Sequence, residues 1–307
     1  MLIVGTRAHL EDLDRSYTYA EDVLVTAVAV SSFSGGVGSL LAGSARPTWS
    51  LLDGERIVLL DEFDMTFVTG LAGPKAQAMA AAAGGTLVVG LEGAHLVTVS
   101  PDGTVSELPA FDQVAGRESW SNPAGPTPEL RSIAVSQSDV WYANVHVGGL
   151  WRSDDQGQSW RNVIAPESDV HEVVTGFGGT VAVAAAIGFG WSTDGGETWQ
   201  WMTDGLHAGY ARAVALDGET AFVTASTGPD TSDGRLFRCR LGASFEACGS
   251  GLPESFPFNL DTGSVAASGG HVALGTRNGH IFRSSDSGSS WELAAEGMRP
   301  VRVLRFN

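Results

Sequence analysis

The sequence has only two cysteines, Cys239 and Cys248, among 307 residues. Two thiols cannot form the disulfide framework that stabilises many small secreted domains, so the fold must depend on a hydrophobic core. The sequence also lacks a run of about 18 apolar residues, the length that a membrane-spanning helix requires. Residues 1–6 carry neither the basic region nor the long apolar region of a signal peptide. We therefore expect a cytoplasmic protein with reduced thiols and no contact with a membrane.

Positive charge is scarce as well. The chain has 18 lysines and arginines against 35 aspartates and glutamates, which gives a net charge of −17. A surface this acidic favours solubility and repels phosphate backbones, so we expect a monomer without a nucleic-acid partner. Charged residues make up only 17% of the chain, whereas glycines number 40, a composition typical of an all-β protein with many tight turns.

Three octapeptides fit the pattern S-x-D-x-G-x-[ST]-W, at residues 153–160, 192–199 and 284–291. In such a turn the aspartate accepts hydrogen bonds from backbone N–H groups, the glycine adopts a positive φ, and the tryptophan folds back over the hairpin. Residues 235–240 align with the strand before the third octapeptide and predict a degenerate fourth copy. Cys239 takes the serine position of that copy and Cys248 follows in the next strand, so the two thiols are expected to lie where they could link the hairpin.

The copies fit a unit of about 44 residues, the usual size of a four-stranded propeller blade. Seven antiparallel units account for the chain as one domain, 1–307, although six or eight units are alternatives because the first two lack a good octapeptide. The last strand is expected to pair with residues 1–6 and close the ring, which removes the open sheet edge. The sequence thus predicts an all-β, seven-bladed β-propeller, with inner strands near residues 23–30, 76–83, 130–136, 171–177, 211–217, 263–268 and 301–307.

The octapeptides resemble the repeats of the Asp-box, or BNR, superfamily of propellers. That superfamily includes sialidases, xyloglucan-active glycosidases, sortilin-type receptors and proteins similar to photosystem II assembly factors. The resemblance implies the fold and says little about the ligand, because the boxes are structural turns. The Arg-Ile-Pro segment typical of sialidases is absent, and Tyr210 has no evident glutamate partner. A sialidase-like glycosidase is therefore the least favoured of the functions that the resemblance suggests.

Ligands of propellers usually bind at the mouth of the central channel, on the face where the chain enters each inner strand. We expect Trp120, in a loop rich in proline and asparagine, to be exposed there and to stack on a sugar or peptide. Long loops are often functional, and the sequence predicts four insertions on this face, at residues 61–75, 111–129, 225–234 and 251–259.

Polar residues recur at two positions of the repeat, both beside this face. One position is the start of the inner strand, where the aligned residues are Gln77, Arg131, His171, Arg212 and Arg302. The other is the approach to the third strand, where the aligned residues are His9, Arg46, His95, Arg235 and His280, and nearby Arg7, His146 and Arg277 align with one another.

These side chains predict a binding site at the channel mouth. Neutral imidazoles that converge on an axis favour a divalent transition metal such as Zn, Cu, Fe or Mn, and the candidate ligands are His9, His95, His146, His171 and His280. Fixed guanidinium groups favour a small carboxylate or phosphate ligand, and the candidates are Arg7, Arg46, Arg131, Arg212, Arg277 and Arg302, with Trp120 beside them. A metal together with an anionic ligand satisfies both sets.

The sequence leaves open whether the protein is an enzyme. A metal-dependent hydrolase, lyase or oxygenase would take its catalytic groups from His171, Glu172, His207 and Tyr210, with Glu172 or the nearby Asp169 as metal ligand or general base. One alternative is a non-catalytic platform that docks a partner protein on its arginines. Another is that duplication copied polar junction residues that have no function.

Overall fold

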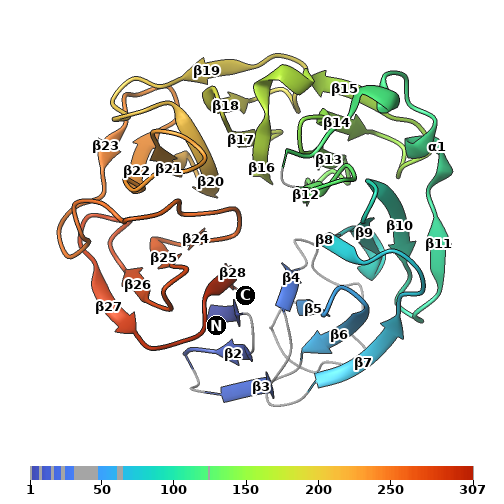
Figure 1. Ribbon diagram of the computed structural model, residues 1–307, viewed down its shortest axis with the longest axis horizontal. Helices are drawn as coiled ribbons and strands as arrows, with labels where there is room; N and C mark the ends of the chain where they lie inside the picture. Colours follow the sequence, from blue (N-terminus) through green and yellow to red (C-terminus); the bar gives the residue numbers. More distant parts are fainter. Residues whose placement is uncertain are drawn as a thin grey trace.

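The computed structural model describes residues 2–6, 9–14, 17–21, 25–30, 48–60, 65–123 and 125–306. These residues form seven four-stranded antiparallel sheets, which stand in a ring around a central axis (Figure 1). None of the helices in the described residues is long and apolar enough to cross a membrane. The predicted seven-bladed β-propeller is confirmed, and the helical pieces in these residues are α1 (Pro109–Asp112), η1 (Ala83–Gly85), η2 (Arg117–Ser119) and η3 (Pro166–Ser168).

Each blade runs from an inner strand beside the axis to an outer strand at the rim. The first blade consists of β28 (Val301–Phe306), β1 (Leu2–Thr6), β2 (His9–Asp12) and β3 (Tyr17–Glu21). The second consists of β4 (Val25–Val30), β5 (Thr48–Leu52), β6 (Arg56–Leu60) and β7 (Met65–Gly70). The third consists of β8 (Ala76–Ala81), β9 (Leu87–Leu91), β10 (His95–Val99) and β11 (Val105–Glu107).

The remaining four blades follow the same order. The fourth consists of β12 (Leu130–Val135), β13 (Trp141–Val145), β14 (Gly149–Ser153) and β15 (Arg161–Ile164). The fifth consists of β16 (Val170–Thr175), β17 (Val181–Ala185), β18 (Gly188–Ser192) and β19 (Gln200–Met202). The sixth consists of β20 (Tyr210–Asp217), β21 (Thr220–Ser226), β22 (Arg235–Arg240) and β23 (Glu246–Ala247). The seventh consists of β24 (Val265–Ser268), β25 (His271–Gly275), β26 (Ile281–Ser284) and β27 (Glu292–Ala295).

The first blade closes the ring. Its inner strand β28 pairs antiparallel with β1, so that Leu304 lies opposite Val4 and Phe306 opposite Leu2. The two chain ends accordingly lie side by side in Figure 1. Leu304 is fully buried with Leu2 and Val4. The pairing of the last strand with the first was predicted and is confirmed.

The hydrophobic core lies between neighbouring blades rather than at a single centre. One buried cluster, for example, joins Leu51 and Ile57 of the second blade to Ala76, Met79 and Val89 of the third. The inner strands are rich in alanine and valine, as in the AQAMAA sequence of β8. Small side chains are needed here because the strands converge on the axis and leave little space between them.

The three octapeptides form the same turn between the third and outer strands of their blades. In the first of them Ser153 Oγ accepts a hydrogen bond from Gly157 N at 2.8 Å, and Asp155 Oδ1 accepts one from Ser159 N at 2.8 Å. Trp160 Nε1 donates to Gly157 O at 3.1 Å, and Gly157 has a φ of 85°. Equivalent bonds occur in the turns at residues 192–199 and 284–291. The strand order places these turns at the end of the propeller opposite the channel mouth.

An arginine before the turn links each of three blades to the next. Arg152 Nη1 donates to Gly195 O in the following blade's turn at 2.6 Å, and the same carbonyl accepts a hydrogen bond from Tyr142 Oη at 2.8 Å. Arg238 donates in the same way to Ser287 O at 2.6 Å, and Arg283 pairs with Asp14 at 2.6 Å. Burial raises the pKa of Tyr142 to about 12, so its hydroxyl stays a donor.

In the sixth blade the two cysteines do not pair, and in the second blade the predicted insertion is partly a strand. Cys239 and Cys248 are free and buried in two different hydrophobic clusters, so they do not link the hairpin. Burial raises the pKa of each thiol to about 12. The predicted insertion at residues 61–75 contains the outer strand of the second blade, because β7 occupies Met65–Gly70.

Candidate functional site

Most of the inner strands have a β-bulge near their first residues. In β8, β12, β16, β20 and β28 the pairing register slips there, which leaves an unpaired residue. A bulge turns its extra side chain away from the regular strand pattern and is common beside active sites. The extra residues include the five that the sequence alignment placed at one position, namely Gln77, Arg131, His171, Arg212 and Arg302.

A polar cavity of about 340 Å³ occupies the mouth of the channel. Its charged lining consists of four arginines and two carboxylates, which leaves a net charge of +2 in a chain of net charge −17. Arg212 pairs with Asp261, and it also donates to Tyr210 Oη at 3.3 Å. The cavity therefore offers a local positive field to a small anion, through Arg131, Arg212, Arg277 and Arg302, with Glu129 and Asp261 between them.

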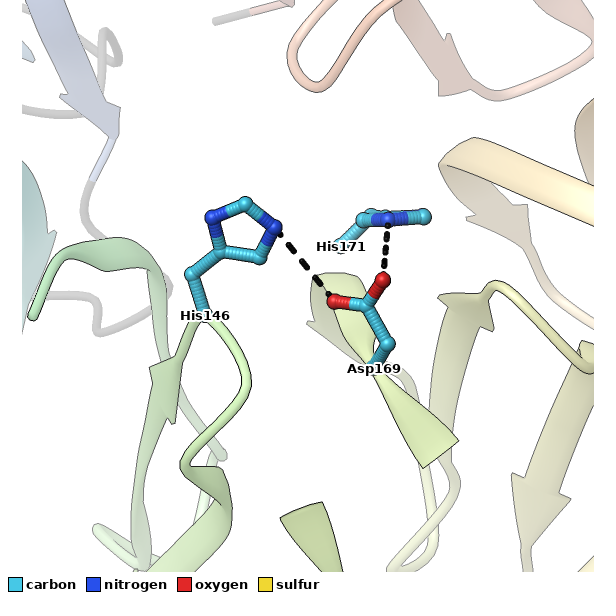
Figure 2. Close-up of side chains that lie close together, drawn as sticks. All are labelled: His146, Asp169 and His171. Carbon is cyan, nitrogen blue, oxygen red and sulfur yellow. Dashed lines mark ion pairs between the residues drawn. The ribbon is translucent and has the colours of Figure 1, made fainter. Parts of the chain in front are cut away.

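Three side chains that could hold a metal ion meet beside this cavity. His146 follows β13, Asp169 precedes β16, and His171 is the bulge residue of β16. Figure 2 shows the two imidazoles pointing toward the Asp169 carboxylate from either side. His146 Nε2 lies 3.4 Å from Asp169 Oδ1, and His171 Nε2 lies 3.4 Å from Asp169 Oδ2. One ligand atom from each residue lies within 4.8 Å of the other two.

The hydrogen bonds of this cluster leave acceptor atoms facing one another. His171 Nδ1 lies 2.6 Å from Ala211 O and donates to it, so the neutral ring directs the lone pair of Nε2 toward Asp169. His171 Nε2 and Asp169 Oδ1 are both buried without a hydrogen-bond partner among the described residues. Buried polar atoms are rarely left unpaired, and a cation between them would satisfy both.

The surroundings of His171 and Asp169 favour a neutral imidazole and an ionised carboxylate, the protonation states that a metal site requires. Burial lowers the pKa of His171 and favours the neutral imidazole. Burial alone would raise the pKa of Asp169, but His171, His146 and Arg131 outweigh it, so the pKa is lowered and the carboxylate is ionised. A hydrogen bond with His146 lowers the pKa of Glu129 in the same way.

The distances in the cluster suit a transition metal. Two ligand atoms bound at 2.0–2.1 Å in tetrahedral geometry are about 3.3 Å apart. This is close to the 3.4 Å from His146 Nε2 to Asp169 Oδ1 and from His171 Nε2 to the other oxygen, Oδ2. His146 Nδ1 lies 3.2 Å from Asn122 Oδ1 and 3.7 Å from Glu129 Oε2, the kind of outer contact that orients a ligating imidazole. Two histidines and one carboxylate suit Zn, Fe or Mn.

Glu172 does not contribute to this cluster. Its fully buried carboxylate accepts hydrogen bonds from Val214 N at 3.0 Å and Gly263 N at 3.1 Å. Burial raises its pKa to about 7. Glu172 therefore holds neighbouring blades together, and Asp169 supplies the carboxylate that faces the histidines.

The other histidines that the sequence singled out lie outside the cluster. His95 Nδ1 lies 2.8 Å from Asp112 Oδ1. His207 is held by Asp233 and stacks on Phe237 at a ring distance of 5.4 Å. His280 precedes β26, and its ring lies 6.2 Å from that of Phe282. The described structure brings only His146 and His171 together, and Tyr210 joins them with its ring 4.9 Å from His171.

Trp120 is not the exposed platform that its loop suggested. Only 7% of its surface is accessible, because the segment between β11 and β12 folds inward. Its ring lies 5.4 Å from Phe111 and 5.5 Å from Trp151, and Arg117 lies 4.8 Å above it. Trp120 thus anchors the loop. Arg7, Arg46 and the side chain of His9 lie outside the described residues.

No family model matches the chain, and no curated protein matches it. Among solved structures, the chain is similar to an ancestral GH74 enzyme, with 16% identity, a TM-score of 0.62, and coverage of 95% of this chain and 40% of the other. It is also similar to the GH74 xyloglucanase from Xanthomonas campestris, with 17% identity, a TM-score of 0.58, and coverage of 94% and 46%. These likenesses establish the fold alone. The chain spans less than half the length of both GH74 structures.

Proposed function

We propose that this propeller binds a divalent transition metal at His146, Asp169 and His171, and a small anionic ligand at the adjacent arginines. The observation that carries the proposal is the set of buried acceptor atoms around Asp169. Three acceptor groups face one another there, and two of their atoms have no hydrogen-bond partner among the described residues. Burying such a set of acceptors costs free energy when no cation is present, and a bound cation offsets that cost.

The anionic ligand is proposed on the charge of the cavity. Four arginines outnumber two carboxylates in its lining, against the acidic balance of the whole chain. Guanidinium groups bind carboxylate and phosphate oxygens in pairs and remain charged at every ordinary pH. The Arg212 side chain pairs with Asp261 at the edge of the cavity. A ligand anion would therefore compete with Asp261 for this arginine.

A bound metal would supply Lewis-acid chemistry or an activated water to a ligand held by the arginines. Tyr210 is the group best placed to donate a proton, because its hydroxyl accepts a hydrogen bond from Arg212 and its ring lies 4.9 Å from that of His171. The proposal thus includes a metal-dependent hydrolase, lyase or oxygenase. We further propose a cytoplasmic location, which the two free cysteines support because thiols stay reduced there.

Metal binding by tag-free protein tests the proposal. We expect apo protein titrated with Zn²⁺ or Mn²⁺ in a calorimeter to bind one equivalent. His171→Ala and Asp169→Asn should weaken this binding about 10- to 100-fold or more, because each removes a ligand. His95→Ala and His280→Ala are matched controls from the same face and should bind normally.

Two results would reject the proposal. One is the absence of stoichiometric metal binding by the wild-type protein. The other is equal loss of binding in the control variants, because it would place the ion elsewhere. Crystals soaked in Zn²⁺ give an independent check, since anomalous density should appear between His146 and His171 and beside Asp169.

A further inference from the structure

We infer that Arg131 couples the two halves of this site, so that metal binding at His146 releases Arg131 to bind a small dianion in the channel mouth. The inference deepens the proposed function and rests on it. It identifies the class of ligand, and it names the residue through which the metal controls ligand affinity.

In the described structure Arg131 is hydrogen-bonded to Nε2 of His146, the atom that would bind the metal. Its Nη1 atom lies 3.3 Å from His146 Nε2 and donates to it. An imidazole nitrogen has one lone pair, so His146 Nε2 can accept this hydrogen bond or bind a cation, but not both. Metal binding therefore requires Arg131 to move.

Electrostatic repulsion by the metal also favours movement of the Arg131 guanidinium away from His146. A divalent ion at the cluster would lie beside the guanidinium and repel it, in a buried setting where screening by water is weak. Arg131 is also close enough to Arg212 for the two charges to disfavour one another, an effect that adds to burial in lowering the pKa of Arg131. An anion between Arg131 and Arg212 would relieve this repulsion.

The channel has space for the movement. Arg131 is the bulge residue of β12, and its side chain lines both the mouth cavity and a narrower cavity of about 70 Å³ below it. Turning from His146 into the mouth brings it to the same space as Arg212 and Arg302. No change in the strands is needed, because a long arginine side chain can reorient about its own bonds.

The charge of the cavity sets the ligand class. Its lining carries a net charge of +2, which a dianion neutralises and a monoanion does not. A small dicarboxylate and a tetrahedral dianion share this chemistry, and a volume of about 340 Å³ accepts either. We therefore expect succinate and sulfate to bind more tightly than acetate.

The test compares anion binding by apo and Zn²⁺-loaded protein, measured by calorimetry with succinate, sulfate and acetate. For wild type we expect succinate and sulfate to bind about tenfold more tightly to the loaded protein, a coupling of ordinary size. Because coupling is reciprocal, each dianion should also tighten Zn²⁺ binding about tenfold.

Arg131→Gln separates this inference from the proposed function. The variant should bind Zn²⁺ at least as tightly as wild type, since a neutral side chain replaces the repelled charge. Its affinity for succinate should be low and nearly equal in the apo and loaded forms. Arg277→Gln is the matched control, because it lines the mouth away from His146: both affinities should fall while their ratio stays about tenfold.

The outcomes are distinct. If wild type binds no metal, the proposed function fails and the coupling fails with it. If wild type binds metal but anion affinity does not change on loading, only the coupling is overturned. If Arg131→Gln keeps the full metal dependence, the metal acts on the anion directly and Arg131 is not the coupling residue. Equal binding of acetate and succinate would overturn the dianion class.

Discussion

Gly195 O is shared by two donors from the neighbouring blade, and this sharing predicts a non-additive pair of substitutions. Arg152 donates to this carbonyl at 2.6 Å and Tyr142 at 2.8 Å. Tyr142→Phe removes one neutral hydrogen bond and should cost about 1 kcal/mol. Arg152→Met removes a charged one and should cost about 2 kcal/mol. The exposed partners Asp154 and Glu197 add little to the second value.

The double variant should cost more than the sum of the single ones. Each single substitution leaves Gly195 O with its other donor, whereas both together leave the carbonyl without either. An unpaired acceptor of this kind costs about 1–3 kcal/mol if it stays away from water. We therefore expect the double variant to lose about 4–6 kcal/mol of unfolding free energy, with a positive interaction energy of at least about 1 kcal/mol.

Urea denaturation followed by far-ultraviolet circular dichroism and by tryptophan fluorescence provides the measurement, with coincident transitions as the condition for comparing free energies. Arg238→Met is the matched comparison, because no second donor to Ser287 O occurs among the described side chains. Arg238→Met alone should therefore leave Ser287 O without a donor, as the double variant leaves Gly195 O. Additivity within about 0.5 kcal/mol would refute the reasoning, because water would then replace the lost donors.

Three further predictions concern burial. Leu304→Ala, in the closing strand, should cost about 2–5 kcal/mol in the same urea assay, as for a core leucine, and a negligible cost would contradict closure of the ring by β28. Cys239 and Cys248 should not react with a thiol reagent at pH 8 in the native protein and should react fully in urea, because burial raises both pKa values to about 12. Acrylamide should leave the emission of Trp120, isolated in a variant whose other tryptophans are phenylalanine, largely unquenched, and strong quenching would show that the ring is exposed.

The architecture was predictable because the repeat carries its own evidence. The octapeptides locate the turn after the third strand in three of the blades, and with the degenerate copies their spacing gives the blade size. The alignment of Arg131 with His171 and Arg212 also placed them at one position, which the structure identifies as a β-bulge. A sequence pattern can show that these residues are equivalent. It cannot show the bulge, because one unpaired residue hardly alters the alternation of a strand.

The contacts within the site were harder to predict, for geometric reasons. Asp169 and Glu172 lie on either side of His171 in sequence. Which of the two carboxylates faces the histidines depends on the backbone conformation, which the sequence does not show. Asp169 has a φ of 45°, which turns the chain before the strand and brings its carboxylate back to the histidines. Trp120 was misjudged because a loop rich in proline and asparagine usually stays on the surface. Here Phe111 of the same segment and Trp151 of the next blade cover its ring.

Because several blades have the same bulge, the side chains at the channel mouth come from equivalent backbone positions and differ from blade to blade. Each of several blades presents one side chain there from an equivalent backbone position, while the pairing on both sides of the bulge holds the strand in place. Gln77 lines the cavity, and its Oε1 accepts a hydrogen bond from Leu130 N of the next blade at 3.2 Å. Exchanging Gln77 for another polar residue would therefore change both the lining of the opening and one contact between blades. The bulges thus line the opening from the inner strands, whereas the turns that link one blade to the next follow the third strands at the opposite end of the propeller.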